Sequence, residues 1–259
     1  MAFIYGIRGV RAIALVVSLA VQGTLAFAEE LVGASVESRV TVAFAVDPAG
    51  LAPWVPEGWA PVAFPGGPFA GANLLTVFAD QHAQTDAEGV LKQPSSKRFI
   101  VFAGLGKQTD GGEVRFFAYR VYSSDMSEDP YGNALQASLS RRAVMSIDES
   151  GVRTRSENWS ITPSDGSGTL TLTLDFTAGK QNWTQSEANP YSNRIEGFNR
   201  IYRSRQLVDL AMSAPMGKPL AGEISYASSI AGLGEILDGS EAMIAVLDTP
   251  VYQREIFLP

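Results

Sequence analysis

The sequence predicts a β-rich α+β protein whose strands form an antiparallel sheet with few short helices. Segments 36–46 and 169–176 alternate apolar and polar residues, which is the period of strands buried on one face only. Most of the remaining chain consists of β-branched and aromatic runs separated by turn sequences. No low-complexity run divides the chain, and its length suffices for one substantial core. We therefore expect residues 29–259 to form one domain.

The first predicted strand, 36–46, has a clear apolar face. Its four valines and Phe44 fall on one parity, and Glu37, Arg39 and Thr41 fall on the other. We therefore expect the valines to be buried and the polar residues to face away from the core.

A short helix is expected directly after this strand. Asp47 can cap a helix that begins at Pro48, because a proline has no N–H to leave unpaired in the first turn. Pro53 and Pro56 then end the helix within about two turns. A Gly/Pro loop leads to a further strand that ends at residue 80.

The middle of the chain is predicted to be a meander of antiparallel strands. Asp110-Gly111 is a hairpin signal between the first two strands of this part, and segment 82–96 is polar and is expected to be an exposed loop. The strands are expected at 98–106, 113–123, 135–147, 152–161 and 169–176.

The last third of the chain is expected to be more irregular. Segment 179–193 is predicted to be a loop and 194–212 to be irregular with some helix. Beyond it, strands are expected at 223–228, 243–248 and 251–257, and a short helix at 233–237. Ala231-Gly232-Leu233 repeats Ala49-Gly50-Leu51, which suggests two copies of a unit made of strand, short helix and strands.

Residues 1–28 have the pattern of a cleaved signal peptide. Arg8 and Arg11 precede an apolar stretch, and Ala26-Phe27-Ala28 is the small-x-small sequence that signal peptidase accepts. The apolar run is interrupted at Gln22 and Gly23 and is shorter than the roughly 20 residues of a membrane span, so cleavage is favoured over a retained anchor. We expect an exported protein, periplasmic or secreted, without a stable membrane anchor. The sequence has no cysteine, so no disulfide can contribute to its stability.

The charge of the chain argues against a nucleic-acid partner. The formal net charge is −7, and removal of the two arginines in residues 1–28 makes it more negative. Phosphate backbones require clustered cations. His82 is the only histidine, and Gly104-Leu105-Gly106 is not followed by a helix, so neither a histidine-rich metal site nor a dinucleotide-binding motif is predicted. We predict no cofactor and no metal.

The order of these elements, together with one motif, resembles the acetoacetate decarboxylase-like superfamily. The motif is D-P-A-G-L-A-P-W-V-P-E at 47–57, where that family has D-x-x-x-L-x-x-x-(L/V)-P-E after its opening strand. The resemblance implies a barrel-like sheet built from duplicated β-α-β units around a cavity for a small molecule.

The chemistry of that family does not follow from the resemblance. Its enzymes form a Schiff base through a lysine whose pKa is lowered by a neighbouring lysine and by burial. The equivalent segment here, 129–134, reads D-P-Y-G-N-A and has no lysine. All five lysines are expected in turns, loops or at a strand edge, and segment 73–79 lacks the acidic residues of the family. Schiff-base decarboxylation is therefore disfavoured.

Two arginines on predicted strands are the candidate ligand anchors. Arg120 shares a parity with apolar neighbours, and so does Arg141, so both are expected to point inward, where a guanidinium requires a carboxylate partner or an anionic ligand. The alternative is a structural ion pair, for example with Glu157 or Glu196. If the two arginines bind one small carboxylate, the body of the ligand would lie against Phe116, Tyr122, Leu139 and Met145.

The sequence therefore favours an exported domain that binds a small organic or fatty acid in an internal cavity without decarboxylase activity. Two alternatives stay open. One is a lyase or decarboxylase that acts on a keto acid without the usual lysine, and the other is a structural or partner-binding secreted protein.

Overall fold

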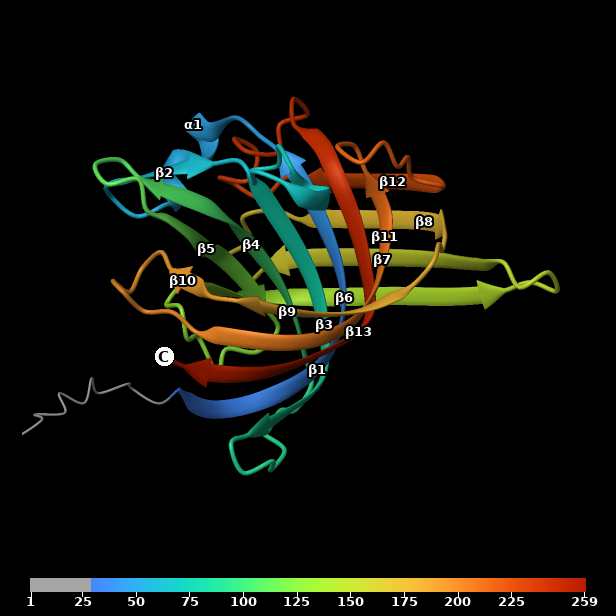
Figure 1. Ribbon diagram of the computed structural model, residues 1–259, viewed down its shortest axis with the longest axis horizontal. Coiled ribbons are helices and arrows are strands. Elements are labelled where there is room, and N and C mark those ends of the chain that lie inside the picture. Colours follow the sequence, from blue (N-terminus) through green and yellow to red (C-terminus); the bar gives the residue numbers. More distant parts are fainter. Residues whose placement is uncertain (1–28) are drawn as a thin grey trace, which may run out of the picture.

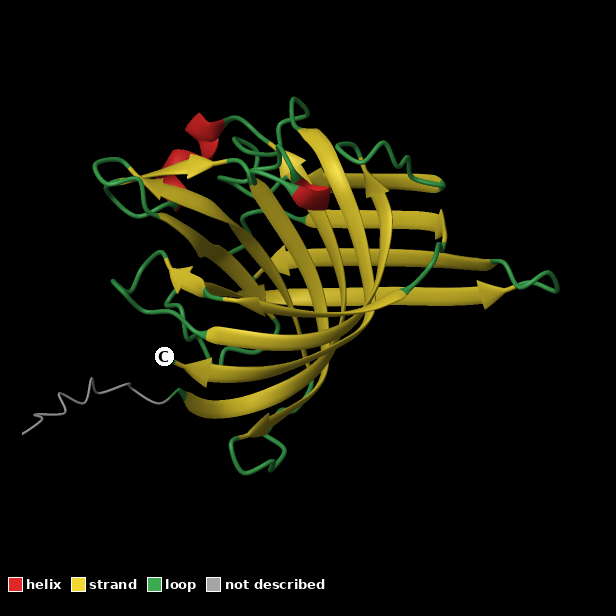
Figure 2. Cartoon of the chain, viewed as in Figure 1, coloured by secondary structure: helices red, strands yellow, loops and turns green. Residues whose placement is uncertain are grey.

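The computed structural model describes residues 29–259, so the predicted signal peptide lies outside the described residues. The described chain is mostly strand with very few helices (Figure 2). Its helices are α1 (Pro48–Leu51) and two 3-10 turns, η1 (Ala52–Trp54) and η2 (Gly67–Phe69). The strands are β1 (Glu30–Ala45), β2 (Trp59–Val62), β3 (Leu74–Asp86), β4 (Lys97–Gln108), β5 (Val114–Ser123), β6 (Ala134–Ile147), β7 (Arg153–Pro163), β8 (Leu170–Thr177), β9 (Asn182–Ala188), β10 (Pro190–Ser192), β11 (Ile201–Ser213), β12 (Gly222–Ser228) and β13 (Ala242–Leu258).

The strands form a single mixed sheet. Its order is β12-β8-β7-β6-β5-β4-β3-β1-β13-β11-β9, with β10 beside β5 and β2 beside β4. The pairs β5–β6 and β5–β10 are parallel and the others are antiparallel. The sheet curls strongly, but it is not closed, so the expected barrel is not formed (Figure 1).

The main core lies on one face of the curled sheet. Val40 and Val42 of β1, with Phe102 of β4, pack in one cluster with Trp159 of β7 and Leu172 of β8. The sheet therefore folds back so that its β6–β8 end covers the β1–β4 region, and burial of the alternating apolar residues stabilises this arrangement.

Several elements confirm the sequence predictions. Helix α1 begins at Pro48, and the Asp47 side chain accepts a hydrogen bond of 2.9 Å from the backbone N–H of Ala49. Strand β8 buries every second residue, as the alternation in 169–176 predicts. The β4–β5 hairpin turns at the predicted Asp110-Gly111.

The last third of the chain differs from the prediction. The expected loop 179–193 contains β9 and β10, and the expected irregular segment contains the long strand β11. Strand β13 is continuous where two strands were expected, and β3 extends through Asp86 into the predicted loop. Pairing with neighbouring strands determines these elements, so local propensity alone was misleading.

The duplicated β-α-β units are not confirmed. Residues 233–237 form turns instead of a helix, and Gly232 has a positive φ of 80° that favours a turn. The first Ala-Gly-Leu segment nevertheless lies against the residues that follow the second, 235–236. A Cβ atom on Gly50 would lie 2.6 Å from the backbone oxygen of Glu235.

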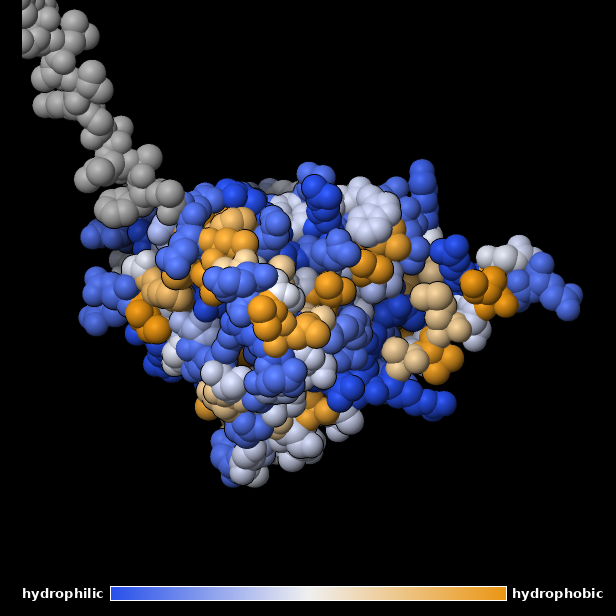
Figure 3. Space-filling model, turned by 90° about the horizontal axis from the view of Figure 1, so that it is seen from below, coloured by the Kyte–Doolittle hydropathy of each residue, from blue (hydrophilic) through white to orange (hydrophobic). Residues whose placement is uncertain are grey.

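The outer half of β6 corrects another prediction. Met145 and Ile147 were expected on a buried face, but their exposed fractions are 49% and 62%. Strands β6 and β7 extend beyond the rest of the molecule, and this end carries apolar side chains on its surface (Figures 1 and 3). The apolar face of β6 is thus buried only in its middle, at Ala137 and Leu139.

No helix in residues 29–259 has the length and apolar character that a membrane crossing requires.

The contact at Gly50 yields a test of the fold. We expect Gly50→Ala to lower the free energy of unfolding by about 1–3 kcal/mol, because the new methyl group would overlap the Glu235 carbonyl. Gly234→Ala is the matched control, since its Cβ meets open space. Urea denaturation of both variants measures the difference, and equal stabilities would contradict the close approach of the two segments.

Candidate functional site

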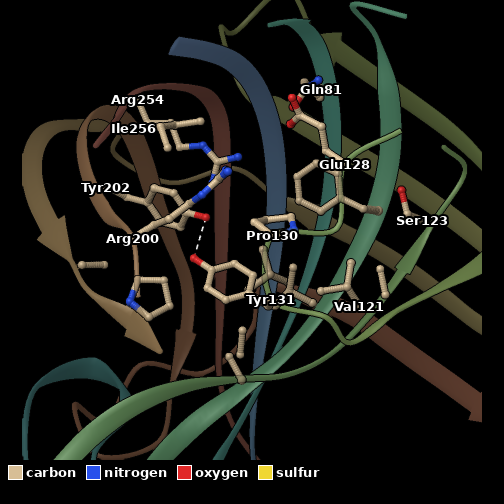
Figure 4. Close-up of a pocket in the computed structure, with 18 of the residues that line it drawn as sticks. Gln81, Val121, Ser123, Glu128, Pro130, Tyr131, Arg200, Tyr202, Arg254 and Ile256 are labelled. Atoms are coloured by element: carbon tan, nitrogen blue, oxygen red, sulfur yellow. Dashed lines mark hydrogen bonds between the residues drawn. The ribbon is translucent and has the colours of Figure 1, made fainter. Parts of the chain in front are cut away.

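A pocket of about 220 Å³ lies on the face of the sheet opposite the main core (Figure 4). Strands β3, β4 and β5 form one wall, and β11 and β13 form another. The loop between β5 and β6 lies across it and contributes residues 128–131.

The walls are apolar because strands β3 and β4 are buried on both faces. Phe78 and Ile100 point into the main core, whereas their sequence neighbours Val77 and Val101 line the pocket. Further apolar lining comes from Phe99, Ala103, Phe116, Ala118, Val121, Pro130, Ala134, Ala188, Pro190 and Ile256.

One end of the pocket holds a buried carboxylate between two arginines. The Glu37 side chain is fully buried and forms ion pairs with Arg39 at 2.6 Å and with Arg254 at 3.0 Å. Ser35 donates a hydrogen bond of 2.7 Å to Glu37 and accepts one of 3.0 Å from Arg254. The guanidinium groups stack on tyrosines, Arg39 on Tyr252 at 3.6 Å and Arg254 on Tyr202 at 4.4 Å.

These groups are ionised at neutral pH. Burial raises the pKa of Glu37, but the charges of Arg254 and Arg39 outweigh this effect, so its pKa is below the usual value. Burial lowers the pKa of Arg254, and the Glu37 carboxylate outweighs it in turn, so the pKa of Arg254 is raised. The end of the pocket therefore keeps fixed charges across the physiological range.

A third arginine and two phenols complete this end. The Tyr131 hydroxyl donates a hydrogen bond of 2.6 Å to the Tyr202 hydroxyl. Burial, with the neighbouring Tyr202, raises the pKa of Tyr131 well above its usual value, so Tyr131 stays a protonated donor. Figure 4 shows Arg200 and Arg254 beside this pair. Within residues 29–259, Arg200 has no carboxylate within 4.0 Å, and its buried Nε has no hydrogen-bond partner.

The opposite end of the pocket is polar but electrically balanced. Glu128 forms an ion pair of 2.6 Å with Lys92 and accepts a hydrogen bond of 3.0 Å from Gln84. The buried Gln81 donates to Gln84 and to the Ser95 carbonyl. These contacts connect the β3–β4 loop with the β5–β6 loop at the rim of the pocket.

Of the six residues predicted to bind a ligand, Phe116 alone lines this pocket. Arg120 faces the other side because β5 has a bulge: Phe102 pairs with Arg120 and Ala103 with Ala118, so Tyr119 is an extra residue. The expected parity of Arg120 with Phe116 is therefore wrong. Its guanidinium lies 4.2 Å from the ring of Trp54.

Arg141 takes part in a structural ion-pair network and does not meet Arg120 in a shared site. It binds Glu157 at 2.6 Å and Asp80 at 3.0 Å, and it donates to Ser38 at 2.6 Å. This arrangement is the structural alternative raised by the sequence. Of the other predicted residues, Tyr122 and Leu139 lie in the main core and Met145 is exposed.

The principal site residues that sequence reasoning missed are Arg200, Tyr202 and Arg254. The sequence contained a pattern that could have identified Arg254. It shares a parity with Tyr252 and Ile256 on β13, just as Arg120 and Arg141 share a parity with apolar residues in their predicted strands. Arg200 and Tyr202 lay in the segment expected to be irregular, where no parity was assigned.

Segment 129–134, which corresponds to the lysine-containing segment of the acetoacetate decarboxylase-like enzymes but has no lysine here, lies at the pocket. Asp129, Pro130 and Tyr131, from the sequence D-P-Y-G-N-A, line it. Lys97 is the one lysine of the described chain in the lining, at the start of β4 and apart from this segment. The structure of residues 29–259 contains no group of three or more histidine, aspartate or glutamate side chains arranged to hold a metal ion.

Comparison with solved structures identifies the fold. The chain matches an acetoacetate decarboxylase-like enzyme from Sphingomonas wittichii RW1 with a TM-score of 0.54 and 12% identity, covering 88% of this chain and 91% of that one. It matches the enduracididine biosynthesis enzyme MppR with HEPES bound at a TM-score of 0.52 and 11% identity, covering 92% and 89%. MppR complexed with pyruvate matches at 0.50 and 12%, covering 91% of each chain.

The protein thus has the acetoacetate decarboxylase-like fold, as its sequence predicted. No family model matches the sequence, and the search of curated proteins gave no match. At these identities the similarity concerns the fold, and the chemistry must be argued from the residues of this chain.

Behind the pocket, an acidic cluster carries more negative than positive charge. Arg155 pairs with Glu157 and lies 3.2 Å from Asp248, and both Asp248 oxygens lack a hydrogen-bond partner among the described residues. Burial raises the pKa of Asp248; Arg155 opposes this effect, Glu157 and Asp209 reinforce it, and the pKa reaches about 7. The folded state therefore binds a proton here that an unfolded aspartate, with a pKa of 3.8, releases.

This proton predicts a pH-dependent stability. Because the folded-state pKa of Asp248 is the higher one, the contribution of Asp248 to the free energy of unfolding falls as pH rises from about 4 to about 7, by up to about 1.4 kcal/mol per pH unit. Asp248→Asn, which keeps the neutral shape, should flatten the profile between pH 5 and 7. Urea denaturation at several pH values measures it, and an unchanged profile in Asp248→Asn would refute the assignment.

Proposed function

We propose that this protein binds a small organic anion, in the first instance a carboxylic acid, in the pocket between β3–β5 and β11–β13. The observation that carries the proposal is the surplus of positive charge at one end of an apolar pocket. Arg39, Arg254 and Arg200 lie there, and Glu37 is the one carboxylate paired with any of them. Arg200 is half-buried and its buried Nε has no partner among the described residues, which is costly, so a negatively charged ligand would stabilise this end.

The geometry of the donors favours a carboxylate over a neutral ligand. Arg200 presents a planar set of N–H donors, and the Tyr202 hydroxyl, which accepts its hydrogen bond from Tyr131, keeps its own proton to donate beside it. Charge-assisted hydrogen bonds of this kind contribute roughly 1.5–3 kcal/mol each. The apolar walls suit a short hydrocarbon body, which is the usual composition of a small-molecule site.

The fold neighbours are consistent with this proposal. One of them, MppR, has been solved with pyruvate, a small keto acid. In this chain we propose binding without imine catalysis, because the segment at the family's lysine position presents Tyr131 to the pocket. We also propose that the protein acts outside the cytoplasm, on the basis of the signal-peptide pattern in residues 1–28.

Arg200→Gln tests the proposed anchor. We expect it to weaken the binding of short carboxylic acids such as butyrate about tenfold or more, because one charge-assisted contact is lost. Arg205→Gln is the control, since Arg205 lies on β11 just after Arg200, is exposed and does not line this pocket. Isothermal titration calorimetry measures both, and loss of affinity in both variants, or no binding by the unmutated protein, would refute the site.

A keto-acid lyase is the competing function. If it used an imine in this pocket, the imine would form on Lys97, the one lysine of the described chain in the lining. Borohydride reduction in the presence of pyruvate traps an imine as a stable adduct on lysine. We expect no adduct by mass spectrometry of the intact protein. An adduct that maps to Lys97 and is absent in Lys97→Arg would establish covalent chemistry in this pocket.

A further inference from the structure

The charges of the pocket indicate the charge of the ligand, and so define its chemical class more closely than the proposal of a carboxylic acid does. At the cationic end, three guanidinium groups face one carboxylate, Glu37. Elsewhere, Glu128 is paired with Lys92, and Asp129 and Lys97 add one charge of each sign to the lining. The lining and its ion-pair partners therefore carry two positive charges in excess.

We propose that the ligand has a compact head with two negative charges, such as a phosphate monoester or two carboxylates on one carbon, on a short apolar body. The inference rests on the proposed function, because it concerns the same pocket. A single carboxylate would leave one of the two surplus charges uncompensated in an apolar surrounding, and a doubly charged head compensates both. The fatty acid considered from the sequence is disfavoured for this reason.

The contacts around the arginine end suit such a head. Glu37 and Ser35 hold Arg254 from behind, and Tyr252 and Tyr202 support the guanidinium planes of Arg39 and Arg254. The arginines are thus fixed before a ligand arrives. The buried Nε of Arg200, without a partner in the described chain, and the Tyr202 hydroxyl, which accepts from Tyr131 and keeps its own proton, supply further donors. Several fixed donors match the several acceptor oxygens of a doubly charged head.

Glu37, Arg254 and Tyr131 keep their protonation states between pH 5 and 8, so the protonation of the ligand can be tested separately. The pKa of Glu37 is lowered, that of Arg254 is raised, and that of Tyr131 is raised well above neutrality. At the other end the pKa of Glu128 is lowered by Lys92 and Gln84, against the effect of burial. Asp248 titrates in this range, but it lies in the cluster behind the pocket and not in its lining.

Butyl phosphate is the probe, because its charge changes at a second pKa of about 6 while its shape stays the same. We expect its affinity, measured by calorimetry, to fall about tenfold from pH 8 to pH 5. Butanesulfonate keeps a single charge over this range, so we expect it to bind at least tenfold more weakly at pH 8 and with no pH dependence. Any effect of Asp248 on the pocket would change the affinity of both ligands. It can therefore be distinguished from the effect of the ligand's own protonation, which changes the affinity of butyl phosphate alone.

Two further comparisons distinguish the possible outcomes of this experiment. Arg200→Gln should reduce the preference for butyl phosphate over butanesulfonate at pH 8 by about tenfold, whereas Arg205→Gln should leave it unchanged. Butylmalonate compared with butyrate distinguishes a dicarboxylate head from a phosphate head. Equal binding of singly and doubly charged ligands would overturn this inference and leave the proposed function standing. Binding of none of the four ligands would refute both.

Discussion

The fully buried carboxylate of Glu37 is the constraint on which the candidate site depends. A carboxylate without water is stable only with ionic and hydrogen-bonding partners, and here Arg39, Arg254 and Ser35 supply them. Since each arginine also stacks on a tyrosine, the positions of both guanidinium groups follow from the position of one acid on the central strand β1. The pocket is preorganised from this point outward.

Irregularities in the strands decide which side chains reach the pocket. Strand β1 shifts its register against β3 between Val36 and Glu37, and against β13 between Glu37 and Arg39. Because consecutive residues of a strand point to opposite faces, Glu37 pairs with the arginines of the pocket, while Ser38 accepts a hydrogen bond from Arg141 of the buried network. Two consecutive polar residues of β1 thus serve two separate clusters.

The same irregularities mark the limit of what the sequence predicts. Alternation predicts the strands well, because burial of one face requires it, and β8 follows the pattern over its whole length. It cannot locate a bulge, which exchanges the two faces beyond it. Val36 was expected to be buried, yet it is exposed, whereas Glu37 faces away from the main core as expected but is fully buried at the pocket. Arg120 was assigned to the wrong face by the bulge at Tyr119.

The identity of the site residues depended on long-range pairing that no local pattern reveals. Arg141 and Arg254 each lie on an apolar face in the sequence, and both find buried acids, but the partners of Arg141 are Asp80 and Glu157, whereas Arg254 shares Glu37 with Arg39. The first arrangement places two acids beside one arginine, and the second leaves positive charge beside an open volume. Which arginine is structural and which faces a ligand is therefore decided by the local ratio of acids to bases, and that ratio is fixed only when β1, β11 and β13 come together.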